Sequence, residues 1–384
     1  MFMTVAGSGE KKTGPRLLFI DNIRILLICL VIMTHCSITY GGPGTWYFTD
    51  PGNAAVAPFV LVVIDSLNQA FFMGFFVLIS AYFVPGSLMR KGRDIFTRDR
   101  LVRLGIPLLV WVLFINPLIL LIFTVGTGSL PSNWATLLNP ITGAGLGPMW
   151  FVFFLLVATF AYLLWTTFHS PDQPGDQKPC TFPGFGSIFA LGILLGIVTA
   201  VVRCFLPIGS MWLFGFQLPF FPQYIAAFII GIYAARNNWF DDIPARVGKL
   251  CTVTALLLIA IQPVFIYLIT NSPAGIAPLM GGPHWQAVFY AFWEQMTGVM
   301  IITALLWIFS RQFNSQGPVT RAMAGDTYTV YIIHPVILIL LSMALASVVI
   351  PQLAKFAIVL ALAIACSFIL AHLIRAVPGV KRVL

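Results

Sequence analysis

The stretch "DNIRILLICLVIMTHC", from Asp21 to Cys36, is apolar enough to cross a bilayer, yet it carries three ionisable groups. Hydrocarbon penalises such groups, so Asp21, Arg24 and His35 need a reason to be there. A helix turns by about 100° per residue, so the eleven residues from Arg24 bring His35 back to within about 20° of the same face. Asp21, three residues before Arg24, can pair with it, and Thr39 continues the line four residues after His35. The stretch therefore predicts a membrane-spanning helix with one polar stripe.

The whole chain has the composition of a membrane protein. Its 384 residues are 59% hydrophobic and only 9% charged, with a mean hydropathy of +0.95. A soluble domain carries about 25% charged residues. We therefore expect an all-α, polytopic bundle of transmembrane helices.

Apolar runs of about 20 residues, the length that spans a bilayer, recur along the chain. The first contains a charge and is too long for a signal peptide, so we interpret it as a retained span. Pro219 and Pro222 predict a break or kink in the sixth, which must be buried in protein or line a cavity. We place ten spans near residues 17–40, 59–84, 104–125, 148–168, 186–207, 213–236, 250–270, 287–310, 324–350 and 353–376.

Most of the 21 lysines and arginines fall on one side of these ten spans. The positive-inside rule then predicts that both termini are cytoplasmic. Residues 1–16 and 377–384 would be tails, and residues 17–376 a single transmembrane domain. The net charge of +9 is thus explained by topology, and we expect no nucleic-acid partner.

No motif indicates a metal or redox centre. The six cysteines are scattered, without C-x-x-C spacing, and no HExxH, Walker or GxSxG sequence occurs in a convincing context. We therefore predict neither a metal site nor a resident cofactor.

A basic segment, "MRKGRDIFTRDRLVRLGIPLLVW", leads into the third span. Arg100 and Arg103 are three residues apart on one helix face. One interpretation is a topology anchor that touches anionic lipid. The other is an anion site, because arginine offers paired donors that suit the phosphates of a donor such as acyl-CoA.

The ninth span contains "GDTYTVYIIHPVILIL", in which Thr327, Tyr331 and His334 share a face. Pro335 removes a helix hydrogen bond beside His334, which is either a packed core residue or a site residue. Other orienting or substrate-binding candidates are Asp21, Asp65, Tyr331 and Glu294.

The connections opposite the basic side are rich in Gly, Pro and Asn and carry aromatic residues. Such residues anchor proteins at the membrane interface. They would equally suit the wall of a site for an uncharged polar substrate such as a sugar. The segments are 41–58, 126–147 and 271–286, with Trp46, Tyr47, Trp134 and Trp285.

Four stretches together resemble the acyltransferase 3 family of integral membrane acyltransferases, over nearly the whole chain. They are "RILLICLVIMTH" from Arg24 to His35, "FFMGFFVLISAYFVPG" in the second span, Arg100 to Arg103 followed by "LGIPLL", and "YTVYIIHPVIL". Ala81 stands where the family usually has glycine. The chain resembles stand-alone members, which include a branch that modifies periplasmic glucans with succinyl groups.

The resemblance implies a bacterial inner-membrane enzyme that moves an acyl group, acetyl or succinyl, from acyl-CoA to a hydroxyl of an extracytoplasmic carbohydrate. Family roles then fall on His35, Arg24, Arg100 and Arg103, with His334 as a further catalytic candidate. His35 would be a general base or an acyl carrier, oriented by a group from the eighth or ninth span. The alternative is a secondary transporter of a sugar or lipid-linked substrate, disfavoured because no internal repeat is obvious and deep acids are few.

Overall fold

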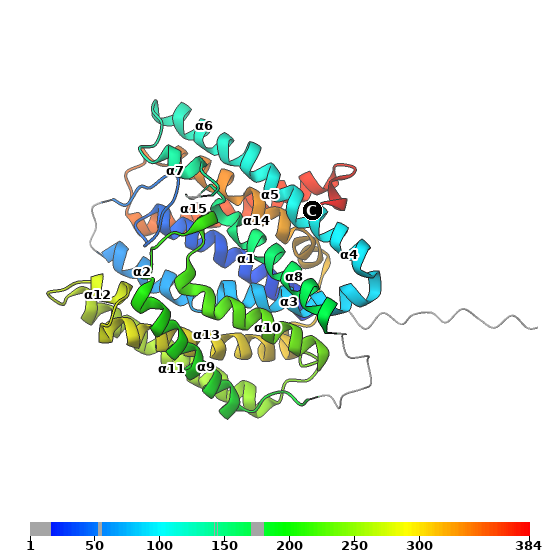
Figure 1. Cartoon of the computed structure of the whole chain (residues 1–384). Coiled ribbons are helices and arrows are strands. Elements are labelled where there is room, and N and C mark those ends of the chain that lie inside the picture. The colour runs from blue at the N-terminus through cyan, green and yellow to red at the C-terminus, as the bar shows by residue number, and fades with distance from the viewer. Residues whose placement is uncertain (1–16, 53–55, 142, 144, 170–179) are drawn as a thin grey trace, which may run out of the picture.

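The computed structural model describes residues 17–52, 56–141, 143, 145–169 and 180–384. In that part of the chain the regular structure is helical, and ten helical segments are long and apolar enough to cross a membrane. Figure 1 shows them side by side in one bundle. The long helices are α1 (Leu18–Thr39), α3 (Phe72–Lys91), α8 (Trp150–Phe168), α9 (Phe185–Phe205), α10 (Phe221–Arg236), α11 (Ala245–Thr270), α13 (Trp285–Gln312), α14 (Pro318–Ala344) and α15 (Gln352–Ala376).

The predicted all-α, ten-span architecture is confirmed, so the chain is a multi-pass integral membrane protein. The second and third spans are longer than predicted, because helix continues into the polar segment between them. The second joins α2 (Val56–Gln69) to α3, and the third runs from α4 (Arg93–Arg100) through α5 (Ile106–Val110) to α6 (Asn116–Thr127). The short helices α7 (Trp134–Leu138) and α12 (Ala277–Met280) lie in connections.

Prolines lie at two of the helix boundaries. The break expected in the sixth span lies just before α10, where Leu218–Phe220 forms a 3₁₀ turn and Pro222 occupies the first turn of the helix. The ninth span was predicted to reach residue 350, but α14 ends at Ala344. A turn then leads to Pro351, which is the N-cap residue of α15.

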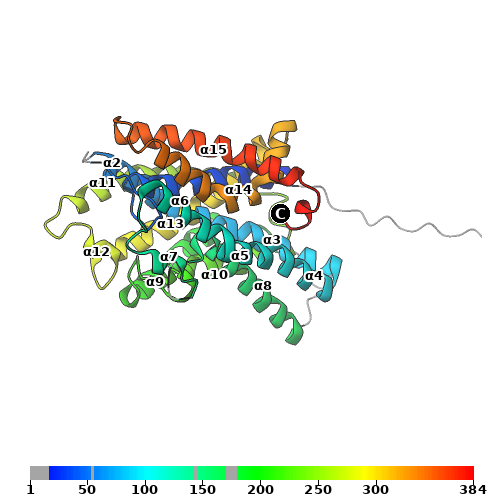
Figure 2. The same ribbon diagram turned by 90° about the horizontal axis from the view of Figure 1, so that it is seen from above.

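The bundle has two distinct ends. The starts of α1 and α4 and the end of α15 lie together, on the right of Figures 1 and 2. We call this the basic end, because it carries Arg100 and Arg103. The other end, with residues 40–52 and α7, is the loop end.

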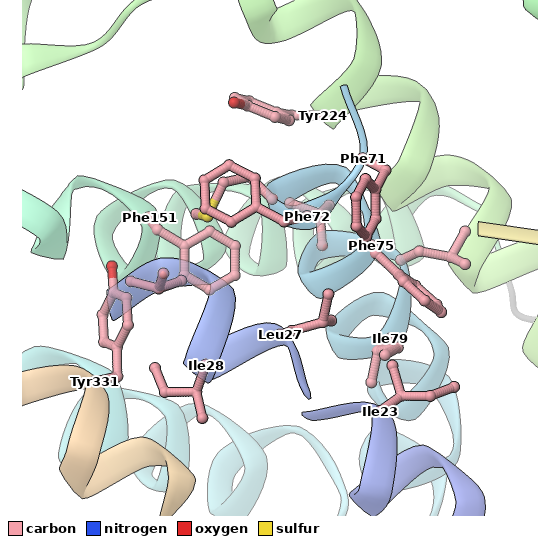
Figure 3. Packing of buried hydrophobic residues seen from close by; sticks show 14 of the residues in the cluster. Ile23, Leu27, Ile28, Phe71, Phe72, Phe75, Ile79, Phe151, Tyr224 and Tyr331 are labelled. Atoms are coloured by element: carbon pink, nitrogen blue, oxygen red, sulfur yellow. The ribbon is translucent and has the colours of Figure 1, made fainter. Parts of the chain in front are cut away.

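Helix α1 lies at the centre of the apolar core. Ile23, Leu27 and Ile28 are almost fully buried, and Figure 3 shows them against α3, with Phe151 of α8 and Tyr331 of α14 nearby. Burial on several sides means that the polar stripe of α1 faces other helices rather than lipid.

Polar side chains satisfy the backbone where helices are interrupted. The carbonyl of Ala70, between α2 and α3, accepts a hydrogen bond from Gln223 Nε2 at 2.6 Å. Pro107 has no N–H for the carbonyl of Arg103, and that oxygen accepts the Tyr328 hydroxyl at 2.8 Å. Such partners are needed because a bilayer offers no water to unpaired backbone groups.

Candidate active site

His35 of α1 meets His334 of α14. Nδ1 of His35 lies 2.9 Å from Nε2 of His334, although the two residues are 299 positions apart in the chain. Their rings lie nearly parallel, with centroids 5.1 Å apart, and His334 is fully buried. His334 lies in the ninth span, one of the two in which the sequence analysis placed the group that orients His35.

Pro335 explains how His334 is fixed. In an α-helix the N–H of residue 335 would bond to the carbonyl of Tyr331, but proline has no N–H. Nδ1 of His334 lies 2.8 Å from that carbonyl oxygen, and a carbonyl can only accept. Nδ1 of His334 must therefore carry a proton, and in a neutral imidazole this leaves Nε2 as the acceptor.

The same logic continues to His35. Because Nε2 of His334 accepts, Nδ1 of His35 must donate across the 2.9 Å contact. A neutral His35 then keeps a lone pair on Nε2. This chain of hydrogen bonds assigns both tautomers and makes His35 Nε2 the basic atom of the pair.

Trp46, in the loop after α1, packs flat against His35. The ring centroids are 4.2 Å apart and the planes differ by 15°. The next residue, Tyr47, donates to Asn116 Oδ1 at 2.8 Å, and Asn116 Nδ2 donates to the carbonyls of Leu137 and Gly145. Burial raises the pKa of the Tyr47 phenol, which keeps it a neutral donor. These contacts anchor the tryptophan beside the histidine.

A cavity of about 350 Å³ extends from His35 to the loop end. Its wall is mostly apolar and aromatic with a few polar groups, the usual character of a small-molecule site. The interrupted start of the sixth span lines it through Gln217 and Phe220, as expected for irregular backbone at this depth. Other lining residues are Trp46, Asp65, Ser66, Gln69, Phe72, Pro148, Trp150, Tyr224, Tyr290 and Tyr331.

Asp65 of α2 reaches this cavity, and it is held by α1. Its Oδ2 accepts the Ser37 hydroxyl at 2.7 Å, and the residue is 5% exposed. Tyr331 also lines the cavity, but its hydroxyl donates to the carbonyl of Pro148. Of these two candidates, Asp65 therefore has the greater capacity to bind a ligand.

The charged residues of the polar stripe on α1, Asp21 and Arg24, lie away from the cavity. Asp21 and Arg24 form the expected pair, with Oδ1 and Nη1 3.1 Å apart. The Arg24 guanidinium also lies 5.0 Å from the centre of the Phe83 ring. Thr39 donates back to the carbonyl of His35 at 3.0 Å. At 1.5 Å per residue, Arg24 and His35 are about 16 Å apart along the helix, with Arg24 nearer the basic end.

Arg100 and Arg103 stand at the basic end, and neither reaches the cavity. The Arg100 guanidinium lies 4.9 Å from the centre of the Phe96 ring. Arg103 is exposed, on a π-helical turn from Leu101 to Gly105. Such turns often occur at functional sites. Neither arginine lines the cavity beside His35.

Glu294 has a partner that the sequence did not suggest. Its Oε2 lies 2.5 Å from Nη2 of Arg203, and the two side chains are 1% and 0% exposed. The Arg203 guanidinium also stacks near the rings of Phe220 and Tyr290, which both line the cavity. Glu294 thus supports the cavity wall from behind.

Residues 17–372 match the profile of a protein family described as "Acyltransferase domain". The chain belongs to the acyltransferase 3 family. Glucans biosynthesis protein C of Salmonella schwarzengrund is 24% identical over 336 residues, which cover 84% of this chain and 82% of the relative. The proteins of the same name from Salmonella heidelberg and Salmonella typhi match equally well. No solved structure matches the chain significantly.

The chain is accordingly a membrane acyltransferase, which decides against the transporter alternative. Sequence reasoning missed two residues of its cavity region, Trp46 as a partner of His35 and Arg203 as the partner of Glu294. The signal for Arg203 was available, because it is a lone charge at the end of an apolar run. The sequence marked Trp46 only as part of an aromatic wall, and its contact with His35 depends on how a loop folds back.

Proposed function

We propose that this acyltransferase moves an acetyl or succinyl group from acyl-CoA to a hydroxyl of a carbohydrate. The observation that carries the proposal is the hydrogen-bond chain that leaves Nε2 of His35 basic beside a cavity. The name of the similar glucans biosynthesis proteins supports a carbohydrate acceptor.

In the proposed reaction, His35 Nε2 takes the proton of the acceptor hydroxyl as its oxygen attacks the thioester carbonyl. The C–S bond then breaks, and the leaving thiolate of CoA receives the proton from His35. His334 holds the imidazole in the correct tautomer and accepts from its Nδ1–H throughout, as the third member of a catalytic triad does. If His35 instead carried the acyl group, its Nε2 would attack the thioester before the acceptor hydroxyl does.

The donor would approach from the basic end, which the excess of lysine and arginine predicts to be cytoplasmic. Arg100 and Arg103 would bind the phosphates of CoA, because guanidinium groups pair with phosphate oxygens. The Asp21–Arg24 pair lies on the stripe of α1 that leads from this end toward His35. We assign Arg24 to the passage of the donor's acyl arm, with Asp21 orienting it.

Replacing Arg103 with alanine should raise the KM for acetyl-CoA about tenfold or more, with a small change in kcat. A hydrogen bond to a charged group contributes about 1.5–3 kcal/mol, and this one would form before the chemical step. The measurement is initial-rate kinetics in detergent with varied acetyl-CoA. Arg98→Ala is the matched control, since Arg98 is an exposed arginine of the same basic segment. Equal effects of the two substitutions would indicate bulk charge rather than a phosphate site.

Replacing His334 with alanine should lower kcat about 10²-fold or more, with little change in the KM for acetyl-CoA, because His35 would lose the acceptor that fixes its tautomer. His334→Gln should recover part of that loss, since the glutamine carbonyl can stand where Nε2 now accepts. The pair of variants is compared by steady-state kinetics. If glutamine is no better than alanine, His334 serves packing rather than positioning.

A further inference from the structure

Asp65 is the one carboxylate among the described residues that line the cavity, and this lining includes no lysine or arginine. A wall of this kind offers no cation that could neutralise an anion. It can accept hydrogen bonds strongly, because an ionised or neutral carboxyl oxygen has free lone pairs. The chemistry of the wall therefore favours a ligand rich in hydroxyl groups over an anionic one.

The two carboxylate oxygens of Asp65 differ in their hydrogen bonding. Oδ2 accepts the Ser37 hydroxyl at 2.7 Å, whereas the buried Oδ1 has no hydrogen-bond partner among the described residues. A buried acceptor without a partner is costly, and each such atom calls for an explanation. Asp65 lines the cavity. A small rotation of the carboxylate that uncovers Oδ1 would let a ligand supply the missing donor.

Gly42 shows how tightly the Asp65–Ser37 contact is enclosed. A Cβ atom at Gly42 would lie 2.4 Å from both Asp65 Oδ2 and Ser37 Oγ. The loop at Gly42 therefore packs closely over the Ser37 side of the carboxylate, and a larger residue there would displace this contact.

Helix α2 presents further polar groups beside Asp65 and is held in register with α1. Gln69 lies one turn later, lines the cavity, and donates from Nε2 to the Tyr224 hydroxyl at 3.0 Å. That bond holds the Gln69 amide while its carbonyl oxygen can accept. Asn68 donates to Thr34 Oγ1 at 3.2 Å, next to His35 in the chain. The polar face of α2 is thus placed relative to the catalytic histidine.

Aromatic rings form much of the remaining wall. Trp150 and Tyr224 stack with centroids 5.5 Å apart, and Tyr290 is held by Arg203, whose guanidinium lies 5.4 Å from the centre of its ring. A pyranose ring has an apolar C–H face and an edge of hydroxyls. Flat aromatic faces next to a fixed carboxylate match both features.

We propose that Asp65 and Gln69 form an acceptor subsite for a neutral oligosaccharide. Asp65 Oδ1 accepts a hydrogen bond from one hydroxyl of the ligand and Gln69 assists, so that another hydroxyl is presented to Nε2 of His35. This inference rests on the proposed function, since it names how the acceptor binds.

The experiment measures binding without any acyl donor. Purified protein in detergent is titrated calorimetrically with glucose tetrasaccharides linked β-1,2, β-1,3 or β-1,4. At least one should bind the wild-type protein, and Asp65→Asn should weaken that binding about tenfold or more. Asparagine keeps the shape, and its one carbonyl oxygen can still accept from Ser37. Its amide nitrogen would then stand in the place of Oδ1, and it cannot accept a hydrogen bond from the ligand hydroxyl.

Two further variants keep the test decisive. Ser37→Ala removes the hydroxyl that donates to Asp65 Oδ2 and leaves the carboxylate, so it should weaken binding much less than Asp65→Asn. Gln69→Leu should weaken binding about threefold or more. This variant replaces Asp65→Asn in the test if Asp65→Asn has a lower melting temperature than the wild-type protein. Equal losses from Ser37→Ala and Asp65→Asn would show a structural role and overturn the proposal.

The remaining outcomes are equally clear. If the wild-type protein binds none of the tetrasaccharides, or binds a chitosan tetramer in their place, a neutral glucose oligosaccharide is the wrong ligand. Cleavage of acetyl-CoA and of succinyl-CoA by the wild-type protein is measured separately, through the release of the free CoA thiol. Binding that depends on Asp65 without any acyl transfer would refute the proposed function and leave the subsite standing.

Discussion

His35→Ala should abolish acyl transfer, with a fall in kcat/KM of about 10²–10⁴-fold, the range that general acid–base catalysis supplies. The variant removes the basic Nε2 and leaves Nε2 of His334 without its donor. The measurement is transfer of radiolabelled acetyl from acetyl-CoA to the acceptor, with the membrane level of the protein determined in parallel. The melting temperature of the variant in detergent should stay close to that of the wild-type protein, so that the loss of activity does not come from unfolding.

A control histidine makes this result specific. His169 lies on the surface at the end of α8, where its ring stacks on Trp165. His169→Ala should leave transfer within about twofold of wild type, because it touches neither the cavity nor His334. Added imidazole should restore part of the activity of His35→Ala, since the substitution opens a space between Trp46 and His334. Full activity of His35→Ala without imidazole would exclude His35 as base and as acyl carrier alike.

Local periodicity predicted the part of this site that lies on one helix. The line from Asp21 through Arg24 to His35 follows from the helix repeat alone, and the Asp21–Arg24 pair is observed. Hydropathy likewise predicted the ten spans. Both signals succeed because they are properties of a single segment in a uniform apolar medium.

The contacts between segments could not be predicted in this way. Nothing in the ninth span alone shows that His334 faces His35, because α1 and α14 are separated by most of the chain. Pro335 did mark the place, since it withdraws a backbone donor and leaves the Tyr331 carbonyl to His334. Trp46 gave no such mark, and its stack on His35 depends on the tertiary contacts of Tyr47 and Asn116.

The helix bounds show a related physical limit. Hydropathy follows the apolar middle of a span, so it ended the second span before the basic segment and began the third after it. The helices nevertheless extend to Lys91 and from Arg93, because a helix satisfies its own backbone in water as well as in lipid. A change of polarity therefore marks the edge of the membrane rather than the end of a helix.

Glu294→Leu should destabilise the protein by about 3–5 kcal/mol, the cost of removing one partner from a buried ion pair. It would leave the guanidinium of Arg203 uncompensated at a position that is 0% exposed, where Nε and Nη1 already have no partner among the described residues. Unfolding by heat or denaturant in detergent measures the effect. Asp242→Asn is the matched control. The Asp242–Arg311 pair is 3.5 Å apart and its side chains are 86% and 55% exposed, and such pairs contribute about 0–1 kcal/mol.

The double variant Arg203→Met with Glu294→Leu distinguishes two effects of the ion pair, its contribution to stability and its support of the cavity wall. Removing both charges should recover most of the stability lost in Glu294→Leu, because apolar side chains can replace a buried pair without an uncompensated ion. It should still bind oligosaccharide less well than wild type, since Phe220 and Tyr290 would lose the cation that lies against both rings. If the double variant were as unstable as Glu294→Leu, the cost would come from packing rather than from an unpaired charge. If it were stable and bound like wild type, the pair would have no part in shaping the cavity.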